Sequence, residues 1–214
     1  GWYYHLVTNG YTLTNAAFFP LYPLLAKGLM LGSTTITSFA NAAVVISIAT
    51  VFTIAWLLLI LSRLENNKAD VYAPLLFLFF PSAMFLAAPY SEGLFIALLL
   101  GFVLALKKEQ WWLAFSVGIL LGLTRVSGLA VVLYPLFLAY SQRHHLKNAL
   151  VALGPIIGTA LFAIYEKIHL GHALAFIHAQ TNWGRTTSLN PHAIASHFAR
   201  DWQDFMSLSM FHPR

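Results

Sequence analysis

Several long apolar stretches constrain this chain more than any other feature of its sequence. Residues 38–61 contain no charged residue. As a helix rising 1.5 Å per residue they would extend about 36 Å, more than the roughly 30 Å hydrocarbon core of a bilayer. Only 9% of the 214 residues are charged, whereas soluble domains have about 25%. An outer-membrane barrel would show short alternating segments instead. We therefore expect an all-α fold, a polytopic bundle of transmembrane helices.

About six membrane segments are expected, in a bundle formed by residues 38–165. They are residues 38–61, 71–88, 93–106, 111–123, 126–140 and 150–165. Pro74 and Pro81 should kink the second segment. The aromatic region 1–37 is interrupted by Pro and Gly, which predicts an outer or lumenal loop with short interfacial helices. Residues 166–214 are polar and contain no spanning run, so we expect a truncated outer or lumenal segment there.

Two of the expected segments are too short to cross a bilayer alone. Residues 111–123 and 126–140 would extend about 20 and 22 Å as helices, so we expect short or re-entrant helices. The turn "TRVSG" between them should then lie below the outer surface. Irregular backbone at that depth is stable only inside protein or beside a water-filled cavity. This predicts an outward-facing pocket near Arg125.

The distribution of basic residues predicts the orientation of the bundle. The loops 62–70, 107–110 and 141–148 contain six of the twelve Lys and Arg residues. The positive-inside rule places these loops in the cytoplasm. It places region 1–37, the "TRVSG" turn and the C-terminal segment on the outer or lumenal side.

Composition also narrows the class and location of the protein. There are no cysteines, which excludes disulfides and thiolate metal sites. No clustered basic face is present, so we expect no nucleic-acid partner. The chain begins at Gly1 without a signal-peptide pattern, and we expect a fragment of a longer integral membrane protein. Short loops and absent cysteines favour a bacterial plasma membrane over the endoplasmic reticulum membrane.

Glu92 is the only acidic residue between Asp70 and Glu109, and it lies in the apolar stretch "FFPSAMFLAAPYSEGLF". One interpretation is a ligand or catalytic carboxylate at the outer mouth of a membrane cavity, since ionisable groups at membrane depth usually serve function. The other is a helix start, in which Ser91 caps the helix and the acid favours its positive dipole end. The second interpretation does not explain the preceding "PY", which ends with Tyr90.

Two further groups have the chemistry of a ligand site. Arg125 in a shallow pocket would suit a phosphate, which its paired donors can grip; the alternative is a snorkelling Arg at a helix end. The stretch "FIHAQTNWGR" contains His178, Gln180, Trp183 and Arg185, an aromatic face and polar donors that suit a sugar. The alternative there is an amphipathic interfacial helix.

Histidines do not form a metal-binding pattern. Six of the nine follow Ile168, but no HExxH pattern is present and no acidic residue lies between His169 and Arg200. We expect no metal and no other cofactor. The candidate substrate-binding residues are Tyr90, Ser91, Glu92, Arg125, His178, Gln180, Trp183 and Arg185.

Four stretches together resemble a known family. They are "GY" (Gly10–Tyr11), "AAFFPLYPLL" (Ala16–Leu25), "FFPSAMFLAAPYSEGLF" (Phe79–Phe95) and "LTRVSGL" (Leu123–Leu129). In this order and spacing they resemble the PIG-V-like mannosyltransferases, membrane glycosyltransferases of the GT-C class. The resemblance covers about residues 1–130 and, more loosely, "FIHAQTNWGR".

The resemblance implies an activity and its partners. The donor would be a polyprenyl- or dolichyl-phosphate sugar and the acceptor a lipid-linked molecule or glycan, with inverting, metal-independent transfer at the outer or lumenal face among membrane lipids. Arg125, with Arg185 as its helper, would hold the lipid phosphate, while Glu92 and Tyr90 organise acceptor or sugar. The resemblance implies that the general base is the Asp of a Trp-Asp pair just before the aromatic stretch. That Asp would precede Gly1, so the catalytic residue is unknown within this chain.

The sequence departs from the family pattern at a second position, and two other classes of protein are alternatives to the enzyme. Position 93 is Gly where the family more usually has Ser. A transporter or lipid flippase also needs a cavity with a buried Glu and Arg, but it should show internal repeats and ionisable residues near the midplane. A non-catalytic membrane scaffold would need no outward cavity.

Overall fold

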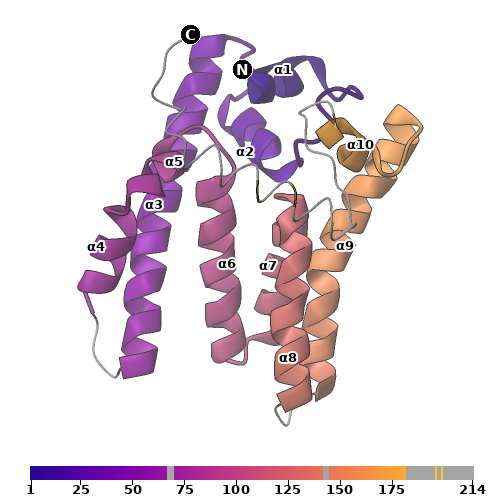
Figure 1. Ribbon diagram of the computed structural model, residues 1–214. Coiled ribbons are helices and arrows are strands. Elements are labelled where there is room, and N and C mark those ends of the chain that lie inside the picture. Colours follow the sequence, from indigo (N-terminus) through magenta and orange to yellow (C-terminus); the bar gives the residue numbers. More distant parts are fainter. Residues whose placement is uncertain (67–69, 142–144, 182–195, 197–198, 200–214) are drawn as a thin grey trace.

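The computed structural model (Figure 1) describes residues 1–66, 70–141 and 145–181, and the single residues 196 and 199. In these ranges the chain forms α-helices and two 3-10 segments and no strand, which confirms the all-α fold. The elements are α1 (Trp2–Asn9), α2 (Leu21–Leu29), α3 (Ile36–Asn66), α4 (Tyr72–Leu78), η1 (Pro81–Ala83), α5 (Met84–Ala87), α6 (Glu92–Lys107), α7 (Trp111–Gly122), η2 (Val126–Val132), α8 (Leu133–Ser141), α9 (His145–Leu170) and α10 (Ala175–Thr181).

Two helices, α3 and α9, are long and apolar enough to cross a membrane by length and composition. They have 31 and 26 residues. The outer face of α3 is apolar and bare: Val45, Phe52 and Trp56 are 52%, 72% and 61% exposed. Soluble monomers rarely expose contiguous apolar faces of this kind. Such a face is more stable against lipid or another apolar surface than against water.

Residues 71–88, expected as one segment kinked at Pro74 and Pro81, are interrupted more strongly than a kink. The structure divides them into α4, η1 and α5. Pro81 lacks the N–H that a continuing helix needs and disfavours helical backbone at Phe80. Phe79, which ends α4, already leaves the helical region with φ −90° and ψ 0°. Pro74 lies in the first turn of α4, where a missing N–H is tolerated.

The other predicted segments appear as helices, with changed ends. α6 and α7 match the predictions closely. The segment expected at 126–140 begins as the 3-10 segment η2 before it becomes α8. α9 extends beyond the predicted segment 150–165 at both ends, from His145 to Leu170. Two short helices, α1 and α2, occupy region 1–37.

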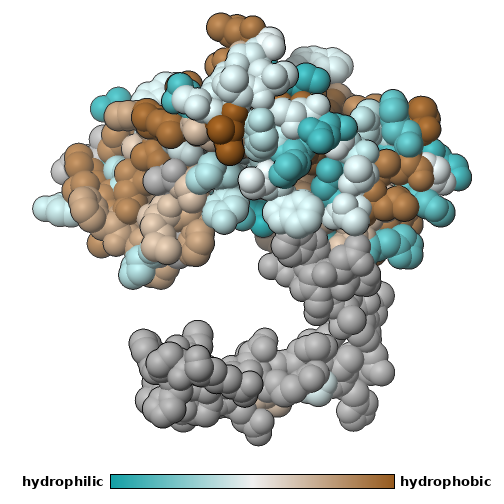
Figure 2. All heavy atoms as spheres, turned by 90° about the horizontal axis from the view of Figure 1, so that it is seen from above, coloured by the Kyte–Doolittle hydropathy of each residue, from teal (hydrophilic) through white to brown (hydrophobic). Residues whose placement is uncertain are grey.

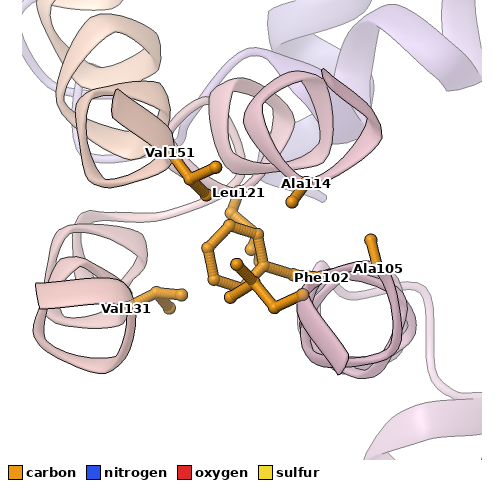
Figure 3. Packing of buried hydrophobic residues seen from close by; sticks show 7 residues of the cluster. Phe102, Ala105, Ala114, Leu121, Val131 and Val151 are labelled. Carbon is orange, nitrogen blue, oxygen red and sulfur yellow. The ribbon is translucent and has the colours of Figure 1, made fainter. Parts of the chain in front are cut away.

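The largest hydrophobic cluster holds α6, α7, η2 and α9 together (Figure 3). The ring of Phe102 from α6 is fully buried among Leu121 of α7, Val131 of η2 and Val151 of α9. Burying an aromatic side chain stabilises a fold by about 1.5–3 kcal/mol. The cluster therefore fixes α6 relative to η2. α6 begins at Glu92, and η2 begins directly after Arg125.

Glycines let α7 and α9 pack with their backbones in contact. A Cβ on Gly122 would lie 2.2 Å from the carbonyl oxygen of Pro155, and a Cβ on Gly158 would lie 2.1 Å from that of Ile119. Small residues allow such close helix packing in apolar surroundings. The contact is reinforced by Thr159, whose hydroxyl donates to the carbonyl of Gly122 at 3.2 Å. The end of α7 is thereby held just before the "TRVSG" turn.

The two ends of the bundle differ in structure. Where α3 and α6 end, Lys107 forms an ion pair with Glu65; Lys147, at the start of α9, lies 5.6 Å from the ring centroid of Trp111. The opposite end contains α1, α2 and α10 (Figure 1). Figure 2 looks onto that end, where hydrophilic residues gather near the middle and hydrophobic residues dominate the left.

Candidate functional site

A cavity of about 770 Å³ lies at the end of the bundle that contains α1 and α10. Its walls come from segments far apart in the sequence: residues 1–3, 17–19, 89–92 and 124–126, with Phe39 and Gln180. The cavity beside Arg125 that the sequence predicts is therefore present. A volume of several hundred Å³ is typical of small-molecule sites.

Glu92 and Arg125 meet in this cavity as an ion pair. Nη1 of Arg125 donates to Oε1 of Glu92 at 2.9 Å, and both side chains are about one third exposed. The guanidinium carbon also lies 5.9 Å from the ring centroid of Phe95, within range of a cation–π contact. Arg125 donates no hydrogen bond to any other described residue. Its remaining N–H groups can donate hydrogen bonds to an anionic ligand.

The local fold places these two charges at helix starts. Glu92 is the first residue of α6 after Ser91, whose hydroxyl makes no capping hydrogen bond. The capping interpretation is thus half right: the pair begins a helix, but the Ser side chain does not cap it. Arg125 is extended, with φ −167° and ψ 160°, directly before η2.

Backbone contacts hold the "TRVSG" turn in place. The amide of Leu21 donates to the carbonyl of Leu123 at 3.0 Å, and the hydroxyl of Thr124 donates to that of Leu120 at 2.7 Å. A Cβ on Gly128 would lie 2.3 Å from the carbonyl oxygen of Leu121, so only glycine allows this close fold-back. The turn therefore presents Arg125 from a rigid support.

Aromatic rings form the wall nearest the N-terminus. The ring of Tyr3 lies 5.0 Å from Phe18 and 4.7 Å from Tyr22, centroid to centroid, and Trp2 stacks at 6.2 Å on Phe18. Burial, with the nearby charge of Glu92, raises the pKa of the Tyr3 phenol, although Ser91 and Arg125 oppose the shift. Tyr3 therefore stays protonated at neutral pH and can donate a hydrogen bond.

Tyr3 and Trp2 were not among the residues selected from the sequence. The available signal was the aromatic density of region 1–37, which is equally typical of an interfacial belt. Of the selected residues, the structure places five on the cavity: Tyr90, Ser91, Glu92, Arg125 and Gln180. His178 is on α10 but does not line the cavity. Trp183 and Arg185 lie outside the described residues.

Glu166 is a second carboxylate that sequence reasoning missed. It is fully buried in α9, and its Oε2 accepts a hydrogen bond from the amide of Phe176 at 3.2 Å. The ring of Phe176 packs against Phe19 and Phe162. These contacts attach α10, and with it Gln180, to the bundle. A lone acid in the apolar run 150–170 was the available signal.

A second cavity has a volume of about 810 Å³. Six of its lining residues come from α4, η1, α5 and the residue before η1: Leu76, Phe77, Phe80, Ala83, Phe85 and Leu86. α6 contributes Ile96 and Glu92, and Glu92 is common to both cavities. Within the described part of the chain, no three His, Asp or Glu side chains gather as metal ligands would.

The chemistry available in the first cavity is specific. A guanidinium with donors that no described residue uses suits a phosphate, aromatic faces suit the apolar side of a sugar ring, and hydroxyl and amide groups suit its hydroxyls. No protein-family model, curated protein or solved structure matches the chain. Any assignment of function therefore depends on this site and on the sequence motifs that form it.

Proposed function

We propose that the protein is a membrane glycosyltransferase that moves a mannosyl or related residue from a polyprenyl- or dolichyl-phosphate sugar to a lipid-linked or glycan acceptor. The observation that carries the proposal is the ion pair of Glu92 and Arg125 inside an aromatic-walled cavity. Three of the stretches that resemble PIG-V-like mannosyltransferases supply the walls of that cavity: "AAFFPLYPLL", "FFPSAMFLAAPYSEGLF" and "LTRVSGL".

The proposal includes a polytopic membrane bundle of about six segments, with the cavity on the outer or lumenal side. The bare apolar face of α3 supports a lipid environment. Lys107 of α6 and Lys147 of α9 lie at the end opposite the cavity, as the positive-inside rule expects of a cytoplasmic end. A bacterial plasma membrane is the favoured location.

The proposed reaction is a displacement at the anomeric carbon of the sugar. An acceptor hydroxyl forms the new C–O bond as the bond to the lipid phosphate breaks, and the phosphate leaves with the electron pair. Arg125 stabilises that departing charge. A carboxylate takes the hydroxyl proton. Attack opposite the leaving phosphate inverts the anomeric configuration.

Transfer assays on the full-length protein, with polyprenyl-phosphate mannose and candidate lipid acceptors, test the proposal. Arg125→Ala should lower kcat/KM by about 100-fold, since removing one donor to a developing oxyanion has effects of this order. Glu92→Gln should lower it by about tenfold because the charge-assisted bond to Arg125 is lost. Arg63→Ala, at the opposite end of the bundle, is the matched control. Normal transfer by Arg125→Ala at normal expression would contradict the proposal.

A transporter or flippase is the alternative, and the arrangement of polar groups argues against it. Glu92, Arg125 and Gln180 lie on one cavity at one end of the bundle, whereas alternating access needs ionisable groups near the midplane. Lipid translocation by the purified protein in vesicles, without sugar transfer, would favour this alternative.

A further inference from the structure

We propose that the second cavity, between α4, α5 and α6, holds the hydrocarbon chain of the sugar donor while the donor's phosphate lies on Arg125. This inference rests on the proposed function, because it assigns one substrate of that reaction to a place. It concerns a cavity that the Glu92–Arg125 site does not itself require.

The two cavities share one wall residue, Glu92, which lines both of them. On one side of it lie Arg125, Tyr90 and Ser91. On the other side every lining residue is apolar. A ligand that crosses this boundary must be polar at one end and hydrocarbon at the other, as a lipid phosphate is.

The charge state of the boundary favours this arrangement. Glu92 is paired with Arg125 at 2.9 Å, so the chain would pass a neutralised carboxylate rather than a free charge. Arg125 keeps donors on the cavity side because Nη1 alone serves Glu92 among the described residues. The phosphate and the chain can therefore be bound together.

The walls of the second cavity are built to leave it open. The helix break at Pro81 separates α4 from α5 and interrupts the wall of the second cavity. Leu76 and Phe80, which line this cavity, are 74% and 63% exposed. The start of α6, next to Glu92, is packed tightly, because a Cβ on Gly93 would lie 2.8 Å from the hydroxyl of Thr50 and 3.1 Å from the carbonyl of Leu86. A flexible hydrocarbon chain fits such an irregular cavity, which has Glu92, the partner of Arg125, in its lining.

Photolabelling tests the inference without depending on transfer. The probe is dodecyl phosphate with a diazirine at the far end of its chain, applied to the full-length protein in detergent. Label should map to the peptide 72–106 and should fall when polyprenyl-phosphate mannose competes. Dodecanol carrying the same diazirine should label this peptide weakly, since it lacks the phosphate that Arg125 binds.

Two adjacent phenylalanines provide a matched pair of variants. Phe80 lines the second cavity and Phe79 does not, and both are exposed, so either substitution leaves the core intact. Phe80→Lys should weaken probe binding by about tenfold, the loss of one aromatic contact with a hydrocarbon chain. Phe79→Lys should leave binding within about twofold of wild type.

The outcomes separate this inference from the proposed function. Label mapping to another part of the chain, with Arg125-dependent transfer intact, overturns the chain assignment alone. Equal labelling by the phosphate and the alcohol, unaffected by Arg125→Ala, shows general contact with bilayer lipid or a partner surface and also overturns it. Labelling that requires Arg125 and Phe80 supports the inference even where no acceptor is yet transferred to.

Discussion

The hydroxyl of Tyr22 is buried next to the cavity and makes no hydrogen bond to the described residues. Burial, with a smaller effect of Tyr3, raises its pKa to about 12. The unfolded chain would ionise Tyr22 near its ordinary value of 10.0. Between these values the unfolded state binds fewer protons, so the free energy of unfolding should fall as pH rises from about 10 to about 12.

Tyr22→Phe should therefore raise stability and reduce its alkaline sensitivity. The substitution removes a buried hydroxyl without a partner, a change worth up to about 1 kcal/mol in favour of the fold. Urea unfolding in detergent at neutral pH and at about pH 11 measures both effects. Tyr4→Phe is the control, since the Tyr4 hydroxyl is bonded to the carbonyl of Thr34 at 2.9 Å and is exposed. An equal alkaline loss in Tyr22→Phe would contradict the assignment.

For single residues, the sequence indicated the charged residues of the cavity but not its aromatic residues. Glu92 and Arg125 stood out because ionisable residues are rare in an apolar chain, and the structure brings them into contact. Tyr3 did not stand out, because its place depends on α1 folding over residues 17–19. Glu166 was missed because the predicted end of its helix fell one residue before it.

Among the elements, the contact of α7 with α9 is the least tolerant of added volume. Gly158→Ala would force a methyl group against the carbonyl of Ile119, 2.1 Å from an ideal Cβ. Neither backbone can yield without moving its helix, so the cost should be about 1–3 kcal/mol. The shift should also displace the "TRVSG" turn and lower transfer.

Gly28→Ala is the matched control for that substitution. An added Cβ at Gly28 meets nothing within 4 Å, and alanine favours helix α2 by about 1 kcal/mol over glycine. Thermal unfolding in detergent should therefore move in opposite directions for the two variants. A Gly158→Ala protein as stable as wild type would contradict the described packing.

The attachment of α10 depends on Glu166. Glu166→Ala removes the acceptor of the Phe176 amide, which should cost about 1–3 kcal/mol because a buried donor is left unpaired. Hydrogen exchange should accelerate at residues 175–181 while α7 stays protected. Ile168→Ala, exposed on the same helix, should change neither. Unaltered protection of α10 in Glu166→Ala would show that the rings alone hold it.

Helix ends show where sequence patterns lose their force. The length of the apolar runs predicted α6 and α7 because both are continuous apolar runs between polar loops. The break at Pro81 was expected only as a kink, since a proline alone does not reveal whether neighbours restore the helix. The 3-10 form of η2 depends on the close contact of Gly128 with α7, which is a tertiary effect.

The whole molecule offers a direct test of orientation, because the chain has no cysteine. Ser33→Cys lies at the cavity end and Gln110→Cys at the basic end, and both positions are exposed. In intact cells, a membrane-impermeant maleimide should label the first variant and spare the second; both should react after permeabilisation. Equal labelling in intact cells would contradict a bundle that crosses the membrane in the proposed orientation.

The cavity walls run from Gly1 to Gln180, and this has a consequence for the order of synthesis. A ribosome produces the Tyr3 wall first, the Glu92 and Arg125 walls much later, and α10 later still. Because chains grow from the N-terminus and their early parts fold first, the cavity is completed only after α9 and α10 have been made. A nascent chain thus holds the charged pair before it holds a closed pocket, and any ligand that needs all of these walls can bind only when nearly all of this sequence has been made.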